Sequence, residues 1–318
     1  MAFRQRKVYQ RQCSAPLDVI AFRATITAIR RITLRYGKLA SVKPVIPNVL
    51  TIAGVDPSGG AGVIADIKVI SAHGAYACAV VAALTAQNTK VVDAVFAIDP
   101  SFVARQLETL YADVRIDALK IGMLGQAAVI EVVADRLARH DTPHRVLDPV
   151  MVAKSGDALL EKTAIGALRE TLLPLATIIT PNLPEAGVLL EARAVETIKE
   201  MYRVAERLRE LLPSSGARWV YLKGGHLPGG DALDLLTDGD HMIELNIARV
   251  DTKNTHGTGC TLSAALAALL PQMGDVPEAA RRAKAYVTEA LRYADQLSVG
   301  GGHGPVHHFH AMWRPRVT

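Results

Sequence analysis

Cysteine is scarce in the sequence. Only Cys13, Cys78 and Cys260 occur in 318 residues, and the last two lie far apart without CxxC spacing. Such few and scattered thiols do not make a disulfide framework, and they are typical of a protein from a reducing compartment. We therefore predict a cytoplasmic location.

Long apolar runs and two common nucleotide-binding loops are also missing. No uninterrupted apolar stretch reaches about 18 residues, so we predict neither a membrane span nor a membrane partner. The chain has no GxxxxGKS/T loop, and "GVDPSGGAG" after the first expected strand lacks GxGxxG spacing. Walker-type and Rossmann-type nucleotide sites are therefore excluded.

Acidic residues are nearly absent from residues 1–47, which hold ten Lys and Arg and a single acid, Asp18. This stretch has a net charge of +9 and the whole chain has +5, so residues 48–318 carry −4. The basicity belongs to the N-terminal stretch and the body is mildly acidic. This distribution argues against a nucleic-acid partner.

We interpret residues 1–47 as a basic N-terminal arm and residues 48–318 as the folded domain. The Arg-rich, acid-poor composition of the arm is similar to that of a transit peptide, which would make the protein organellar. An over-long start-codon assignment, with the true start near Asn48, is the simplest alternative. A tail that binds a surface is the third. The arm lacks the apolar core of a secretory signal.

From Asn48 onward, strand-like and helix-like segments alternate. Strands are expected at 48–54, 77–84, 91–98, 117–124, 144–151, 177–182 and 219–225, with a hairpin over 232–248. Helices are expected at 62–74, 100–114, 127–140, 157–172, 184–191, 197–212, 257–270 and 276–297. This alternation predicts a single α/β domain, with a mostly parallel central sheet flanked by helices on both faces.

Polar or glycine-rich motifs follow several of these strands. They read "AGVDPSGGAG", "KIGML", "LDPVMVAKSG", "TPNLPEA", "KGGH" and "THGTGC". In doubly wound sheets, ligands bind at the carboxyl ends of the strands. The shared placement of the motifs therefore predicts one ligand site, although each motif alone is a weak signal.

The stretch "THGTGC" opens an apolar helix. Gly257 and Gly259 flank Thr258 and let backbone N–H groups approach a ligand, and the helix adds its positive end, so the stretch predicts a phosphate site. An ordinary glycine-rich helix entry is the alternative. Cys260 has three interpretations: a buried small apolar residue, a nucleophile, or a base whose pKa the helix terminus lowers.

Further polar residues stand at strand ends. Asn182 and Glu185 would form a capping box or hold Mg²⁺ and water near phosphates. A carboxylate such as Asp148, at the end of an apolar strand, is costly unless it is paired or functional. Lys223 would serve as a point charge for phosphate. The tail "GGHGPVHHFH" has four histidines, but it lacks cysteine and carboxylate neighbours, which makes it a weak metal candidate.

Seven stretches occur in this order along the chain: "TIAGVDPSGGAGVIADIK", "KIGML", "LDPVMVAKSGDALL", "ITPNLPEA", "KGGH", "NTHGTGCTLSAALAA" and "GPVHHFH". Together they closely resemble the bacterial-type hydroxymethylpyrimidine/phosphomethylpyrimidine kinases of thiamin biosynthesis, in the ribokinase-like superfamily. The resemblance covers about residues 48–313. It does not extend to the arm.

The resemblance implies a ribokinase-like fold, ATP and Mg²⁺ as cofactors, and a homodimer. It implies two successive phosphorylations of a small pyrimidine. The first acts on 4-amino-5-hydroxymethyl-2-methylpyrimidine and the second on its monophosphate, which gives the diphosphate. Cysteine stands where many ribokinase-like enzymes have aspartate, so Cys260 is expected to accept the proton of the attacking hydroxyl.

The resemblance also assigns residues to each ligand. The pyrimidine is expected at Gly54, Asp66, Gln87 and Met123, and the transferring phosphate at Gly257, Thr258, Gly259 and the catalytic Cys260. ATP is expected at Asn182, Lys223 and Lys154, the last in a segment that closes over the site, and Mg²⁺ at Asp148 and Glu185, through water or directly.

Three other functions were weighed against this one. A pyridoxal or pyridoxine kinase of the same superfamily is the nearest alternative. A non-catalytic nucleotide sensor would not need Asn182, Glu185, Lys223 and an intact "GTGC". A thiol-dependent hydrolase would need a histidine placed against Cys260.

Removal of residues 1–47 should leave Tm and ATP-dependent turnover nearly unchanged. The arm carries a charge of +9 and has no periodic hydrophobicity, so we expect it to stay out of the core. Thermal melting and a turnover assay on the full chain and on a chain that begins at Asn48 test this. A large loss in either measurement would show that the arm packs on the body or completes the site.

Overall fold

The computed structural model describes residues 45–151, 162–193, 195–225, 227 and 231–313. Most of the predicted arm, and Lys154 with its segment, therefore lie outside the described residues. The strands are β1 Asn48–Val55, β2 Tyr76–Gln87, β3 Val92–Ala97, β4 Ala118–Ile121, β5 His144–Leu147, β6 Ile178–Ile179, β7 Trp219–Lys223, β8 Asp231–Thr237 and β9 Met242–Ala248. The α-helices are α2 Gly62–Ala72, α3 Pro100–Tyr111, α4 Ala127–Ala138, α5 Lys162–Ala167, α6 Leu183–Leu189, α7 Ile198–Glu210, α8 Thr258–Met273 and α9 Val276–Arg292.

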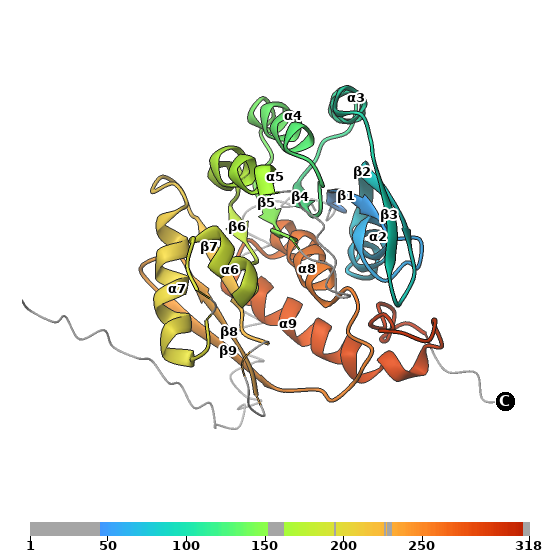
Figure 1. Ribbon diagram of the computed structural model, residues 1–318. Coiled ribbons are helices and arrows are strands. Elements are labelled where there is room, and N and C mark those ends of the chain that lie inside the picture. The colour runs from blue at the N-terminus through green and yellow to red at the C-terminus, as the bar shows by residue number, and fades with distance from the viewer. Residues whose placement is uncertain (1–44, 152–161, 194, 226, 228–230, 314–318) are drawn as a thin grey trace, which may run out of the picture. The chain divides into compact units, whose positions relative to one another are not determined.

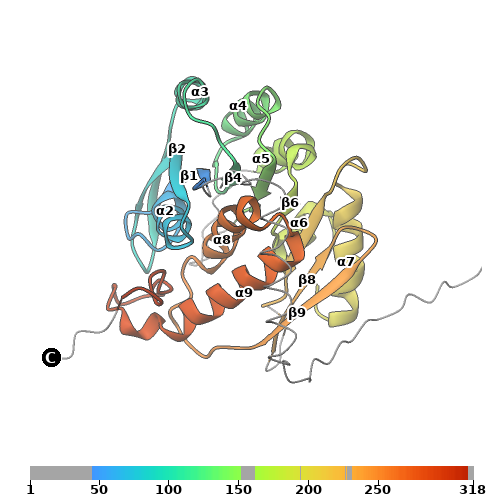
Figure 2. The ribbon, with the colours of Figure 1, turned by 180° about the vertical axis from the view of Figure 1, so that it is seen from behind.

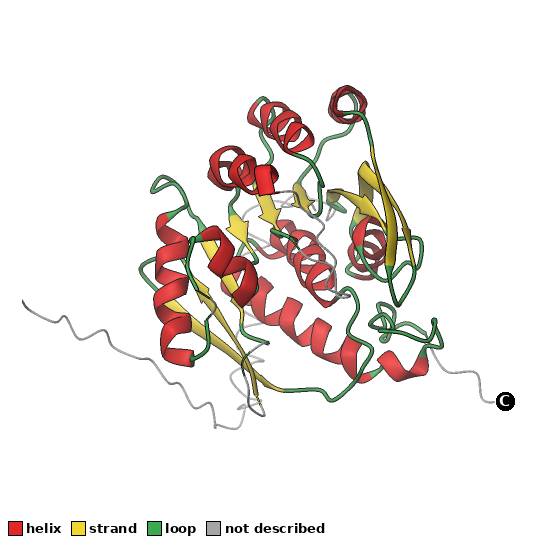
Figure 3. Cartoon of the chain, in the orientation of Figure 1, coloured by secondary structure: helices red, strands yellow, loops and turns green. Residues whose placement is uncertain are grey.

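The described strands form one sheet in the order β3-β2-β1-β4-β5-β6-β7-β8-β9. Strands β2, β1, β4, β5, β6 and β7 run parallel to one another. At the two edges, β3 pairs antiparallel with β2, β8 with β7, and β9 with β8. The expected α/β fold with a mostly parallel sheet is thus confirmed (Figures 1 and 3).

Helices cover both faces of the sheet. One core packs α3, α4, α5, α6 and α7 against one face, and a second core packs α2, α8 and α9 against the other (Figures 1 and 2). The central strands are apolar on both sides for this reason. In β1, Leu50 and Ile52 enter the first core and Val49 the second, as the two-residue period of a strand requires.

Some expected elements differ in length. The strand expected at 177–182 is only the two-residue β6. It ends early because Pro181 has no N–H to donate and Asn182 is already the N-cap of α6. Of the helix expected at 157–172, the structure describes residues 162–172. They form α5 and then a π-helix over Leu168–Leu172.

The described residues offer neither a membrane-spanning helix nor a ready-made metal site. None of the helices there combines the length and apolarity that crossing a membrane requires. The same residues include no group of three or more His, Cys, Asp or Glu side chains placed to hold a metal ion. The weak metal interpretation of the histidine tail therefore gains no support from geometry.

A buried carboxylate joins three elements beside the end of β7. Asp234 of β8 accepts hydrogen bonds from Tyr221 Oη at 2.9 Å and from Lys284 Nζ of α9 at 2.6 Å. Its other oxygen accepts from the N–H of Gly224 at 2.9 Å, the residue after Lys223. The carboxylate thus fixes the antiparallel edge and α9 to the strand that carries Lys223.

Asp234→Ala should lower the free energy of unfolding by about 3–5 kcal/mol, because it leaves the buried phenol of Tyr221 without its acceptor and the buried ammonium of Lys284 without its counter-charge, with only the carbonyl of Ala232 at 2.6 Å. Denaturant unfolding measures the loss. Asp231→Ala, at an exposed position of the same strand, is the matched control and should change stability by about 0.5 kcal/mol or less. Equal effects of the two substitutions would contradict the network.

Candidate active site

The predicted residues meet around the first turn of α8. A Cβ atom added at Gly259 would lie 3.2 Å from Lys223 Nζ and 3.6 Å from Asp148 Oδ2. A parallel bridge pairs Asn182 with Lys223. The ends of β5, β6 and β7 therefore reach the start of α8, as the shared placement of the motifs predicts.

Backbone geometry makes the start of α8 an anion site. Gly257 has φ +78°, and a Cβ atom there would lie 1.7 Å from the carbonyl oxygen of Gly60. Only glycine fits this position. The N–H groups of Gly259 and Cys260 have no acceptor in the described part of the chain. Free N–H donors at the positive end of a long helix are suited to phosphate oxygens.

Asp148 lies directly beside this turn and is fully satisfied. Its Oδ1 accepts from Thr180 Oγ1 at 2.9 Å and from Lys223 Nζ at 3.0 Å. Its Oδ2 accepts from Ser263 Oγ of α8 at 3.2 Å. Burial alone would raise the pKa of Asp148, but Lys223 and the hydrogen bonds outweigh burial and lower it. The carboxylate is therefore charged at neutral pH.

Asn182 and Glu185 form a capping box at the start of α6. Asn182 Oδ1 accepts from the N–H of Glu185 at 2.8 Å, and Glu185 Oε2 accepts from the N–H of Asn182 at 2.7 Å. Glu185 Oε2 also lies 3.9 Å from Lys223 Nζ. Burial raises the pKa of Glu185 to about 7, with a further contribution from the negative charge of Asp148 and partial relief from Lys223. The cap and the site use the same side chains.

A second buried ion pair lies under the same turn, and the sequence reasoning missed it. Lys120 of β4 has a fully buried side chain and donates from Nζ to Asp66 Oδ2 at 2.8 Å. Thr51 Oγ1 donates to the same oxygen at 2.6 Å. Asp66 Oδ1 is buried and has no partner among the described residues. It is free to accept a hydrogen bond from a ligand.

The thiol of Cys260 differs from expectation. Its pKa is raised, chiefly because burial disfavours the thiolate, and the charges of Asp66 and Asp148 add to this. Lys120 and a hydrogen bond from the backbone of Gly62 act in the opposite direction without prevailing. Of the three interpretations of Cys260, the one that requires a pKa lowered by the helix terminus is therefore not met in the ligand-free protein, because burial and two carboxylates outweigh that effect.

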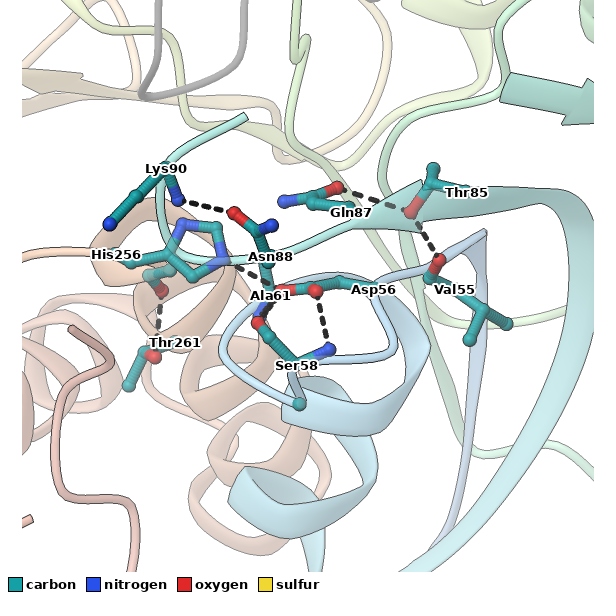
Figure 4. Close-up of polar contacts among 12 residues, drawn as sticks. Val55, Asp56, Ser58, Ala61, Thr85, Gln87, Asn88, Lys90, His256 and Thr261 are labelled. Carbon is teal, nitrogen blue, oxygen red and sulfur yellow. Dashed lines mark hydrogen bonds and ion pairs between the residues drawn. The ribbon is translucent and has the colours of Figure 1, made fainter. Parts of the chain in front are cut away.

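The residues expected to bind the pyrimidine lie around the end of β1 and β2. The N–H of Gly54 donates to the carbonyl of Met123 at 3.0 Å, and a Cβ atom at Gly54 would lie 2.6 Å from Met123 Cε. Gln87 is half-buried at the end of β2 and accepts from Thr85 Oγ1 at 3.2 Å (Figure 4). Its amide nitrogen has no partner within the described residues.

A histidine–carboxylate pair, also missed, joins the β1–α2 loop to the residue before Gly257. His256 Nε2 lies 2.7 Å from Asp56 Oδ2, and both side chains are buried (Figure 4). Asp56 also accepts from the N–H and Oγ of Ser58 and from the N–H of Ala61. Burial would raise the pKa of Asp56, but these hydrogen bonds lower it. The pair keeps the loop against the phosphate site.

Comparisons with known proteins agree with this arrangement. A family model described as phosphomethylpyrimidine kinase matches residues 56–307. The hydroxymethylpyrimidine/phosphomethylpyrimidine kinases of Salmonella typhimurium and Escherichia coli K12 are 53% and 52% identical, each over 84% of this chain and 98% of the relative.

Solved structures show the same fold. A Bacillus subtilis pyridoxal kinase in complex with ADP superposes with a TM-score of 0.76 at 34% identity, over 84% of this chain and 99% of that one. A phosphomethylpyrimidine kinase of Clostridium difficile has a TM-score of 0.68 at 38% identity, over 77% of this chain and 99% of that one. The ribokinase-like fold of these kinases is therefore the fold of this chain.

Glu185→Gln should change how stability depends on pH. The folded protein holds a proton on Glu185 up to a pKa of about 7, and the unfolded chain releases it near 4.5. Stability from this group is therefore present below about pH 4.5 and is lost as pH rises towards 7, by up to about 3 kcal/mol. Gln keeps the capping oxygen and does not titrate. The variant should gain stability relative to the unmodified protein between pH 5 and pH 8, as measured by denaturant unfolding. A difference that stays constant with pH would show that the pKa of Glu185 is ordinary.

Proposed function

The chain belongs to the phosphomethylpyrimidine kinase family, and we propose that it uses ATP to phosphorylate 4-amino-5-hydroxymethyl-2-methylpyrimidine and then the monophosphate product. The diphosphate that results serves thiamin biosynthesis. One observation carries the proposal: the free N–H groups of Gly259 and Cys260 stand beside Lys223 and Asp148 at the start of α8. This arrangement supports transfer of a phosphoryl group rather than hydrolysis at a thiol.

The residues at this turn fit the phosphates of ATP and a Mg²⁺ ion held through water. Lys223 is charged, because Asp148 and Glu185 raise its pKa against the effect of burial, and it can turn from Asp148 to a phosphate oxygen. Glu185 Oε1 has no partner in the described part of the chain, so it can accept from water in a magnesium shell. Mg²⁺ commonly keeps several waters and takes one or two carboxylates besides phosphate oxygens. When bound, the ion would neutralise charge on the phosphates.

Cys260 is the group we assign to the proton of the first acceptor. The thiol of Cys260 first releases its proton to solvent. The hydroxyl oxygen of the pyrimidine then attacks the terminal phosphorus, the new O–P bond forms as the bond to ADP breaks, and the hydroxyl proton passes to the thiolate of Cys260. The raised pKa makes that thiolate scarce but a stronger base. In the second reaction a phosphate oxygen attacks and carries little or no proton, so Cys260 matters less.

Gln87 and Asp66 are the groups we assign to the pyrimidine. An amide offers one acceptor and two donors, so Gln87 can pair with the exocyclic amino group and an adjacent ring nitrogen together. The unpartnered Asp66 Oδ1 offers a second buried acceptor. Pyridoxal has a phenolic oxygen and an aldehyde instead, and a pyridoxal kinase remains the second candidate because solved structures of that name share the fold at 31–34% identity.

We also propose a homodimer formed through the β2–β3 edge. Leu84 of β2 and Phe96 of β3 are paired in register and share one face of the sheet, and both are exposed, Phe96 to 67%. Val95 is exposed on the opposite face of β3. Exposed apolar side chains at the edge of a sheet are a ready surface for a second chain. The cytoplasmic location stays a prediction. The similar Arabidopsis thaliana protein described as chloroplastic keeps the organellar alternative for the arm open.

ATP consumption with the hydroxymethylpyrimidine and with pyridoxal tests the proposal. We expect kcat/KM to favour the pyrimidine by about 10–100-fold, because pyridoxal would leave the buried polar groups of Gln87 and Asp66 without partners. Product mass should show the mono- and then the diphosphate. A preference for pyridoxal would replace the proposal by its alternative.

Cys260→Ala should lower kcat for the hydroxymethyl acceptor by about 10²–10⁴-fold, the usual contribution of a positioned base. Turnover of the monophosphate acceptor should fall far less, since its nucleophile needs little help. Separate assays of the two acceptors, with ADP affinity as the control for folding, measure the difference. If both reactions fall equally, Cys260 packs the site and does not accept the proton.

A further inference from the structure

The histidine-rich stretch near the end of the chain contacts the two site segments mainly through backbone groups, and His303 Nδ1 adds a side-chain contact, 3.2 Å from the carbonyl oxygen of Lys253. We call residues 300–307 the C-terminal strap. At one end, the N–H of Gly302 donates to Thr89 Oγ1 at 3.1 Å and the N–H of His303 donates to the carbonyl of Thr89 at 2.9 Å. Thr89 lies in the turn that follows β2, two residues after Gln87.

The other end of the strap holds the segment before the phosphate site. The N–H of Gly304 donates to Asn254 Oδ1 at 3.1 Å, and the N–H of His256 donates to the carbonyl of Gly304 at 3.0 Å. A parallel bridge then pairs His256 with Pro305. His256 directly precedes Gly257, so this end is one residue from the phosphate turn.

Close packing explains the glycines of the strap. A Cβ atom at Gly302 would lie 2.1 Å from the carbonyl oxygen of Thr89, and one at Gly304 would lie 2.3 Å from Asn254 Oδ1. Both distances are too short for any side chain. Gly301 differs, since a Cβ atom there would lie 3.4 Å from the flexible end of Lys90. Only the strap positions that touch the two site segments therefore exclude a side chain.

We propose that the C-terminal strap is a positioning element that fixes the distance between the acceptor-binding end of β2 and the phosphate turn of α8. This inference rests on the proposed function. One end of the strap contacts the turn after Gln87, and the other contacts the residues before Gly257. These two segments belong to different parts of the site. Pro305, at the end that pairs with His256, also packs against Gly60, where a Cβ atom would lie 3.1 Å from Pro305 Cβ. Gly60 is also the residue whose carbonyl oxygen Gly257 approaches.

The reaction depends on this distance. Phosphoryl transfer relies on positioning and charge stabilisation, and a misplacement of about 1 Å can cost about 100-fold in rate. The acceptor is held by its ring at one end of the strap, while the phosphate it attacks is held at the other. A shift between the ends would therefore leave each ligand bound and slow only the reaction between them.

Three substitutions at the strap contacts test the proposal. Thr89→Val removes the hydroxyl oxygen that accepts from the N–H of Gly302 and adds no bulk to the strap, so we expect this variant to fold. Gly302→Ala and Gly304→Ala introduce side chains at the two close contacts. The matched controls are Thr89→Ser, which keeps the hydroxyl oxygen, and Gly301→Ala, where the neighbour can move away. All five are compared with the unmodified full chain.

We measure kcat for the hydroxymethylpyrimidine, and the Kd of the pyrimidine and of ADP each bound alone. The three contact variants should lose about 10–100-fold in kcat and keep both Kd values within about threefold, whereas the two controls should behave like the unmodified chain. A strap that only stabilises the fold would lower Tm and leave kcat unchanged in the contact variants, and this outcome would overturn the proposal. Losses of the same size in the two controls would overturn it too.

The outcome for the strap is separate from the outcome for the substrate. If the unmodified chain phosphorylates pyridoxal and not the pyrimidine, the proposed function fails. The same comparison of kcat with Kd, made with pyridoxal and ADP, then still decides whether the strap positions the two segments.

Discussion

Two buried ion pairs under the first turn of α8 are the constraint on which the site depends. Lys120 pairs with Asp66 and Lys223 pairs with Asp148, so two positive and two negative charges balance in a region nearly closed to water. A buried charge without a partner costs several kcal/mol, so each member holds its partner in place. The four side chains come from α2, β4, the residue after β5 and the end of β7. Their mutual attraction brings those elements to the same turn.

The balance also explains which groups remain free to titrate. With both pairs complete, Lys120 and Lys223 each already face a carboxylate, so a further negative charge at the turn gains less from them. The pKa values of Glu185 and Cys260 rise, as does that of the paired Asp66, chiefly because burial disfavours the charged form. Binding of a magnesium-loaded nucleotide would change this balance at the point where the acceptor loses its proton. Burial raises the pKa of Cys260, and this makes the thiolate costly to form at rest and also makes it a stronger base during the reaction.

The sequence allowed the fold and many site residues to be predicted, because both depend on local pattern. Alternating apolar segments indicate the sheet, and Asp148 stands out as a carboxylate at the end of an apolar strand. The same reasoning applied to "ALKI" would have found Lys120, since a lysine in a strand buried throughout must be paired. The sequence left three interpretations of Cys260 open, and the one with a lowered pKa fails because the helix terminus is visible in sequence and the degree of burial is not. The contact of Asp56 with His256 joins residues 200 apart, and no spacing rule indicates it.

The strap has a consequence for how the protein becomes active during its synthesis. The hydrogen bond from Gly302 to Thr89 joins residues 213 positions apart. Closing so long a loop adds little entropic cost beyond that of a loop half its length, but it must wait until the later residue has left the ribosome. The strands and helices of the sheet can pair while translation continues. If the strap sets the spacing as we propose, the two halves of the site reach that spacing only after residues 302–305 have emerged, so a nascent chain that already contains Lys223, Asp148 and Cys260 does not yet hold them in register with its acceptor edge.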